Sequence, residues 1–129
     1  MDEILYSKEH FWISIDNDIA TVGMTADLID YLENISCIEL SPIGTLCNKT
    51  DIIGTIYSDL QEFHIDSLFT GEIVEVNDLI LEEVESISSS SFEYNWLYKI
   101  FLNNKSEIND LISKDEYDDF INESEQNYF

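Results

Sequence analysis

The stretch that decides the fold runs from Ile53 to Val76 and reads IGTIYSDLQEFHIDSLFTGEIVEV. It contains two apolar runs of the kind that form strands, Ile53–Tyr57 and Phe69–Val76. A polar segment that begins at Ser58 and Asp59 separates them. The pattern predicts an arm of two strands with an exposed polar end, and we expect the rest of the chain to hold this arm in place.

Outside this arm the sequence predicts more strands than helices. Asp16, Asn17 and Asp18 tolerate tight backbone geometry and indicate a turn between two strands. Four further segments have the apolar, β-branched or aromatic character of strands. They are Trp12–Ile15, Ile19–Met24, Ile35–Leu40 and Trp96–Phe101. With the arm and the N-terminal residues, we expect six or seven short strands.

Helices are predicted at one internal position and at the C-terminal end. Thr25 is a suitable N-cap for a short helix that continues to Glu33. Ser106 is placed to cap a second helix, and Lys114–Ile121 adds a third helical stretch. The serine run at 88–91 reads as a loop. The chain is therefore expected to be mainly β, a single domain over residues 1–129, with a core from about 4 to 121 and a frayed tail at 122–129.

The charge of the chain excludes several classes of partner. It carries 28 carboxylates against five lysines, contains no arginine, and has a formal net charge of -23. No basic face for nucleic acid can be assembled from these residues, and an anionic membrane surface would repel them. The surplus of acid indicates a partner with a positive surface. A general compositional bias explains it equally well, and the sequence leaves both interpretations open.

No catalytic or metal-binding pattern is present. Cys37 and Cys47 match neither a zinc ligand set nor a redox pair, and Cys37 lies in an apolar run that predicts a buried thiol. His10 and His64 show no spacing that would bring them together with carboxylates. An enzyme with its own catalytic residues is therefore not expected. No long apolar segment appears, so we expect no membrane span and a cytoplasmic location.

Five short motifs occur along the chain in an order that resembles one known family. They are Tyr6 with His10–Trp12, then Ala20–Thr25, Leu32–Gly44, Thr70–Asn77 and Asn95–Ile100. Together they resemble the H protein of the glycine cleavage system, over about Tyr6 to Ile121. The resemblance implies a barrel-sandwich hybrid of small antiparallel sheets. It also implies a hairpin that carries a lipoyl group on a lysine at its tip.

The lysine expected from this resemblance is missing. The family's site reads approximately G-x-x-E-S-V-K-A, and the matching residues here are Gly54–Gln61. Gly54 and Ser58 set the register, so that Leu60 occupies the lysine position, with Ser58, Asp59, Gln61 and His64 as its neighbours on the arm. Leucine has no amine and cannot form the lipoyl amide. No lysine lies between Lys49 and Lys99, so no shift of the alignment restores the site.

Three neighbouring positions also depart from the family's pattern. Phe11 stands where the family commonly has an acidic residue in its H-E-W motif, and His64 stands where an acidic residue commonly follows the lysine by four places. In the family, acidic groups near the arm are suited to hold its aminomethyl cargo. Tyr57 replaces the glutamate before the family's serine, which should weaken recognition by a lipoylating enzyme. These losses indicate a repurposed domain.

The leading hypothesis is a non-lipoylated, H-protein-like domain that acts as a binding or regulatory module. No cofactor is expected, and the resemblance implies as partners the glycine decarboxylase, the aminomethyltransferase, dihydrolipoyl dehydrogenase or a lipoate ligase. The alternative is a working glycine cleavage H protein with an unconventional attachment site. An enzyme would instead require a deep pocket that contains His10 or His64 beside paired carboxylates. Leu60 itself would either form an exposed apolar contact or pack against Phe63 or Phe69.

Overall fold

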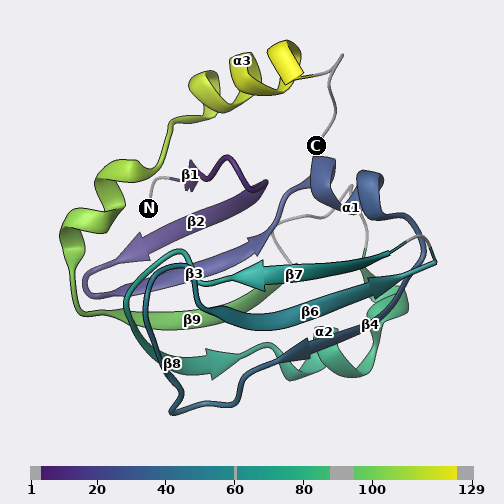
Figure 1. Ribbon diagram of the computed structural model, residues 1–129, viewed down its shortest axis with the longest axis horizontal. Helices are drawn as coiled ribbons and strands as arrows, with labels where there is room; N and C mark the ends of the chain where they lie inside the picture. Colours follow the sequence, from purple (N-terminus) through teal and green to yellow (C-terminus); the bar gives the residue numbers. More distant parts are fainter. Residues whose placement is uncertain (1–3, 60, 88–94, 125–129) are drawn as a thin grey trace.

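Two antiparallel sheets form the body of the protein, seen in a computed structural model that describes residues 4–59, 61–87 and 95–124 (Figure 1). The larger sheet has the strand order β1-β2-β3-β9-β8-β5. Its strands are β1 (Ile4–Tyr6), β2 (Phe11–Asp16), β3 (Ile19–Met24), β5 (Leu46–Cys47), β8 (Gly71–Val76) and β9 (Trp96–Leu102). The smaller sheet has the order β4-β6-β7. It consists of β4 (Ile35–Leu40), β6 (Ile52–Ser58) and β7 (Glu62–Asp66).

Helical segments connect and cover these sheets. They are α1 (Ala26–Leu32), α2 (Asp78–Glu82), the 3-10 helices η1 (Val84–Ser86) and η3 (Lys105–Asp110), and α3 (Lys114–Ser124). Thr25 caps α1, because its side chain accepts a hydrogen bond from the backbone N–H of Leu28. Leu28 and Leu32 then point into the core from one side of the helix.

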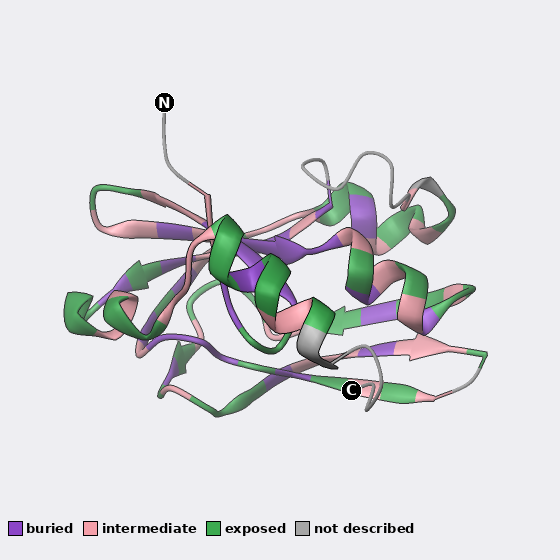
Figure 2. Cartoon of the chain, turned by 90° about the horizontal axis from the view of Figure 1, so that it is seen from above, coloured by how far each residue is buried: buried purple, intermediate pink, exposed green. Residues whose placement is uncertain are grey.

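The main core lies between the two sheets and is built by the period-two alternation of their strands (Figure 2). Ala20, Val22, Ile73 and Ile100 of the larger sheet are fully buried. Ile56 and Ile65 of the smaller sheet are equally buried and belong to the same cluster. This shared core fixes the position of the β6–β7 hairpin relative to the larger sheet.

A second, smaller cluster lies on the outer face of the larger sheet. It consists of Tyr6, Trp12 and Tyr117, and the rings of Tyr6 and Tyr117 are stacked with their centroids 4.8 Å apart. Ile112 and Ile121 also pack against it. The helix α3 therefore covers the β1–β2 side of that face, as the ribbon also shows (Figure 1).

The expected fold class and most of the expected elements are confirmed. The protein is mainly β, the hairpin of β2 and β3 turns at Asn17 with a φ of 57°, and Thr25 caps the internal helix. Nine strands occur in the described residues, more than the six or seven expected, because the two-residue β5 and the polar-looking β7 were not expected. The structure has a short internal helix and helical segments at its C-terminal end.

The expected composition of the arm was wrong. The strand that forms the hairpin with β6 is β7, from Glu62 to Asp66, whereas most of the run Phe69–Val76 belongs to the larger sheet as β8 (Gly71–Val76). Leu68, Phe69 and Ser67 are buried where the chain passes from one sheet to the other. The arm is thus a hairpin followed by a crossover, not two strands that flank a polar segment.

Two details at the C-terminal end also differ from expectation. Asn104, not Ser106, is the N-cap of the helical segment η3, because the Asn104 side chain accepts from the backbone N–H of Ser106. The last helix continues past Ile121 to Ser124. The rest of the expected tail, 125–129, and the serine run at 88–91 lie outside the described residues.

Candidate functional site

The β6–β7 hairpin holds the residues that the sequence places around the modification site. Tyr57 lies opposite Glu62, and Thr55 lies opposite His64. At the end of β6, the backbone N–H of Ser58 donates to the carbonyl oxygen of Gln61 at 2.9 Å. The N–H of Gln61 in turn approaches the Ser58 hydroxyl oxygen at 3.3 Å. Ser58 and Gln61 therefore close the turn in which position 60 falls.

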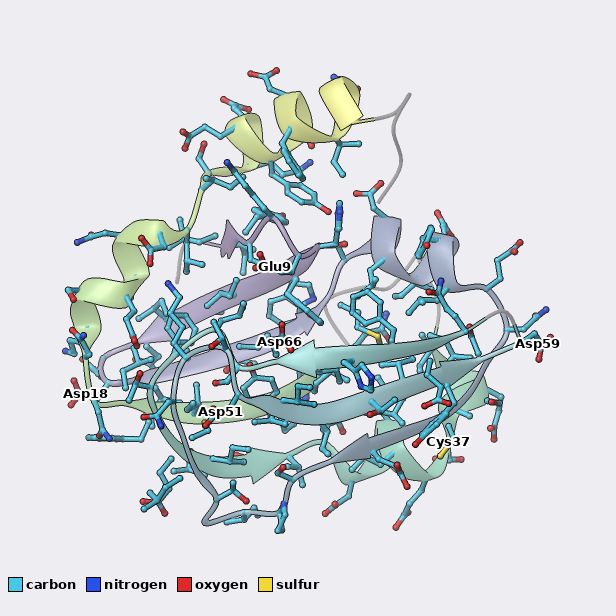
Figure 3. The ribbon with its side chains drawn as sticks, in the orientation of Figure 1. Glu9, Asp18, Cys37, Asp51, Asp59 and Asp66 are labelled. Carbon is cyan, nitrogen blue, oxygen red and sulfur yellow. The ribbon has the colours of Figure 1, made fainter. Side chains whose placement is uncertain are left out.

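The turn projects away from the body of the protein. Leu60 lies outside the described residues, so its two expected environments stay predictions. Asp59, its neighbour in the chain, is exposed and points into solvent at the end of the hairpin (Figure 3). A side chain at this turn is placed to reach another protein.

His64 does not converge with the other candidate residues. It is exposed on β7, and its Nδ1 lies 3.4 Å from the Thr55 hydroxyl across the pair of strands. Phe11, at the other position where the resemblance predicts an acidic residue, is buried on the inner side of β2. Its ring centroid lies 6.3 Å from that of Phe63. Because Phe63 and His64 are consecutive in a strand, they point to opposite faces, and Phe11 and His64 are kept apart.

The outer face of the smaller sheet carries a polar pair that the sequence did not reveal. The Tyr57 hydroxyl donates to a carboxylate oxygen of Glu39 at 2.8 Å, and this hydrogen bond raises the pKa of Tyr57 above its ordinary value. Cys37, opposite Tyr57 in β4, is exposed and points away from the protein (Figure 3). The expectation of a buried Cys37 was wrong, since Ile38 takes the inward position in β4. The buried thiol is that of Cys47.

None of the five lysines lies in the hairpin, and each contacts another side chain. Lys49 pairs with Asp110 and Lys105 with Asp18, both beside η3. Asp18 and Asp59 lie at opposite ends of the protein (Figure 3). Lys99 lies 3.7 Å from Glu75, and Lys114 lies 2.8 Å from Asp118. The fifth, Lys8, lies over the ring of Phe120 at 5.7 Å from its centroid. The ion pairs raise the pKa of Lys49 and Lys114.

His10 takes part in packing between distant segments. It is buried, and its Nδ1 lies 2.9 Å from the hydroxyl of Tyr117 in α3. The Thr25 hydroxyl lies 3.2 Å from the same oxygen and donates to the backbone carbonyl of His10 at 2.9 Å. Burial lowers the pKa of His10 to about 4. The neutral imidazole of His10, just before β2, therefore links the N-cap of α1 to the helix α3.

This contact predicts a pH dependence of stability. Between pH 6.5 and pH 4 the His10 side chain takes up a proton in the unfolded chain but not in the folded protein, so acid favours unfolding. We expect the wild type to lose about 2 kcal/mol of unfolding free energy from this group between pH 7.5 and pH 5. A His10→Gln variant should lack that loss. Urea unfolding at both pH values measures it.

The exposed His64 provides the matched control. Every other titratable group is shared by the wild type and His10→Gln, so the difference between their pH dependences isolates His10. A His64→Gln variant makes the same substitution at an exposed position and should keep the loss that comes from His10, because His10 is intact. If the free energy of unfolding falls equally with pH in the wild type and His10→Gln, His10 is not the cause of the acid-induced loss.

The residues that the structure describes form no cluster of metal ligands. Within 4–59, 61–87 and 95–124, no three His, Cys, Asp or Glu side chains come together as metal ligands. Surface hollows of about 380 and 300 Å³ lie between α1, β4 and η1 and beside α3, and neither is lined by His10 or His64. Over the same ranges, no helix has the length and apolar character needed to cross a membrane.

Comparison with known proteins identifies the family. The family model for the glycine cleavage H-protein matches residues 4–124. The chain is 34% identical over 121 residues to the glycine cleavage system H protein of Staphylococcus epidermidis, covering 94% of this chain and 96% of the relative. It is 31% identical over 115 residues to that of Trichormus variabilis, covering 89% and 88%.

A solved structure has the same fold. The crystal structure of a glycine cleavage system H protein from Mycobacterium marinum superimposes with a TM-score of 0.76, covering 100% of this chain and 99% of that one at 20% identity. The resemblance in the five motifs, the family model and the relatives all agree. This chain belongs to the glycine cleavage H-protein family.

Proposed function

We propose that this protein is a non-lipoylated member of its family, cytoplasmic, that acts by binding a partner of the glycine cleavage system. The observation that carries the proposal is the residue at the lysine position, Leu60, in the turn of the β6–β7 hairpin. An attachment site needs a nucleophilic amine at that turn. All five lysines lie elsewhere, and Lys105 pairs with Asp18, which lies at the end of the protein opposite Asp59.

The retained scaffold supports a role in binding. Members of the family are carriers and not enzymes, and they interact with glycine decarboxylase, aminomethyltransferase and dihydrolipoyl dehydrogenase. A domain with the same sheets and hairpin can present the same surface to these proteins or to a lipoate ligase without carrying cargo. Phe11 and Phe63 support this view. Phe11 stands where the family commonly has an acidic residue suited to hold the cargo, and its ring packs against the ring of Phe63 instead.

Intact mass spectrometry of the protein from its native source tests the absence of the lipoyl group. We expect the mass of the unmodified chain, 15.0 kDa, with no lipoyl adduct. A lipoyl adduct would defeat the proposal and favour the alternative, a working carrier with an unconventional attachment site. Transfer of methylamine to the purified protein in a reconstituted exchange assay would then identify that carrier.

Binding is tested with the four candidate partners as purified proteins at low salt. We expect at least one of them to bind the unmodified chain, and the affinity to fall as salt rises because the chain is strongly acidic. Binding to none of the four would exclude the proposed role.

A further inference from the structure

The outer face of the larger sheet is covered on one side and open on the other. The helix α3 covers the side of β1 and β2 through Tyr6, Trp12 and Tyr117. On the side of β5, β8 and β9, the outward residues Leu46, Glu72 and Phe101 are exposed. A single sheet face that is packed at one end and open at the other has room for a partner at the open end.

One row of directly paired residues crosses this open part. Leu46 of β5 lies opposite Glu72 of β8, Glu72 lies opposite Phe101 of β9, and Phe101 lies opposite Ile19 of β3. Residues that pair directly point to the same face. The next row, with Cys47, Gly71 and Leu102, points inward and is buried. The outward row is named here the Leu46–Ile19 row.

Two large apolar side chains of this row face solvent. Leu46 is 75% exposed and Phe101 is 42% exposed, and Ile19 is half-buried beside them. With strands about 4.8 Å apart, the four residues span about 14 Å across the sheet. Single exposed leucines are common, but an aligned row of this kind marks a surface suited to contact another protein.

A carboxylate lies in the middle of this apolar row. Glu72 is exposed between Leu46 and Phe101, and within the described residues it has no cationic partner. Lys99, also on the outer face, is held by Glu75 at 3.7 Å and lies over the ring of Trp96. A partner that covers the row must therefore supply its own cation to Glu72.

The charge of the chain selects among possible occupants. A second copy would bring another net charge of -23 against the same face and would place carboxylates near carboxylates. An anionic membrane surface would be repelled for the same reason. We infer that the Leu46–Ile19 row is the docking surface for a partner protein with an apolar patch flanked by lysine or arginine. This inference rests on the proposed binding function and assigns it to the sheet face, away from the hairpin.

Binding measurements with surface variants test the assignment. The probe is whichever of the four purified candidate proteins binds the wild type. A Leu46→Thr/Phe101→Thr variant removes the apolar contacts but keeps residues suited to strands, and a Glu72→Lys variant reverses the central charge. We expect each to raise the Kd by about tenfold or more. Thermal unfolding verifies that each variant is folded.

Matched controls are available on the smaller sheet. Ile52 is 62% exposed on β6, and Asp66 is exposed on β7. Ile52→Thr and Asp66→Lys repeat the same chemical changes away from the row, and we expect Kd to stay within about twofold of the wild-type value.

The outcomes distinguish a failure of the docking surface from a failure of the proposed binding function. Unchanged affinity in the row variants, or equal losses in the controls, would overturn the docking surface while the binding function stands. If the wild type binds none of the four proteins, the proposed function fails and the inference fails with it. A dimer in sedimentation that dissociates on Phe101→Thr would show that the row binds a second copy, which also overturns the inference.

Discussion

A Leu60→Lys variant is expected to gain one lipoyl group when it is incubated with a lipoate ligase, ATP and lipoate, whereas the wild type gains none. The substitution supplies the missing amine in a turn that is already formed by Ser58 and Gln61. The neighbouring Asp59 is exposed, so the added side chain should be accessible to the ligase. Intact mass spectrometry before and after the reaction measures the gain, which Tyr57 should slow but not abolish.

Two variants of the same turn control for the register. Asp59→Lys and Gln61→Lys place the amine one residue before and one residue after position 60. If the register set by Gly54 and Ser58 is right, both should be lipoylated less than Leu60→Lys. Preferential modification at 59 or 61 would show that the alignment is displaced. Equal modification at all three would show that any amine in the turn is sufficient.

Replacing Gly71 by alanine is expected to have the largest effect on stability. A Cβ atom at this position would lie 1.8 Å from the carbonyl oxygen of Phe101, a backbone atom of the neighbouring strand. The overlap can be relieved only by separating β8 from β9 or distorting both. We expect a loss of about 3 kcal/mol or more in the free energy of unfolding, measured by urea denaturation, or failure to obtain folded protein.

Gly44 provides the control for Gly71. An added Cβ meets no atom within 4 Å there, but the backbone has a φ of 96°. Gly44→Ala should therefore cost about 1–2 kcal/mol from backbone strain alone. Equal losses in the two variants would mean that the β8–β9 contact relaxes and that the close approach at Gly71 is not the controlling feature.

The elements that sequence alone predicted are those with local causes. The hairpin of β2 and β3 has a run of turn residues at Asp16–Asp18 between two alternating segments. The helix α1 has a capping hydroxyl at Thr25 and two buried leucines one turn apart. In each case neighbouring residues determine the conformation, so no knowledge of distant contacts was needed.

The elements that were missed depend on distant partners. β7 lies in the segment after Ser58 that was interpreted as polar, yet its Ile65 is fully buried and the strand is paired to β6. Cys37 lies in an apolar run, but its exposure depends on which face of β4 meets the core. Such choices are made by the packing of the two sheets and cannot be read from composition.

In the candidate site, too, local features were predictable and contacts between distant residues were not. Gly54 and Ser58 sufficed to identify the turn of the hairpin, because the motif is short and contiguous. The contact of Phe11 with Phe63 joins residues on different sheets, and the Tyr57–Glu39 hydrogen bond joins different strands. The Leu46–Ile19 row required the register of four strands, which no sequence pattern supplied.

The pairing of β3 with β9 has a consequence for synthesis of the chain. Ile19 pairs with Phe101, so the larger sheet cannot close until the residues up to Phe101 have left the ribosome. Until then β3 has an unpaired edge, the kind of edge through which incomplete chains aggregate. Mutual repulsion between nascent chains this rich in acid opposes such aggregation. The charge that would repel a second folded copy thus also acts between unfinished polypeptides.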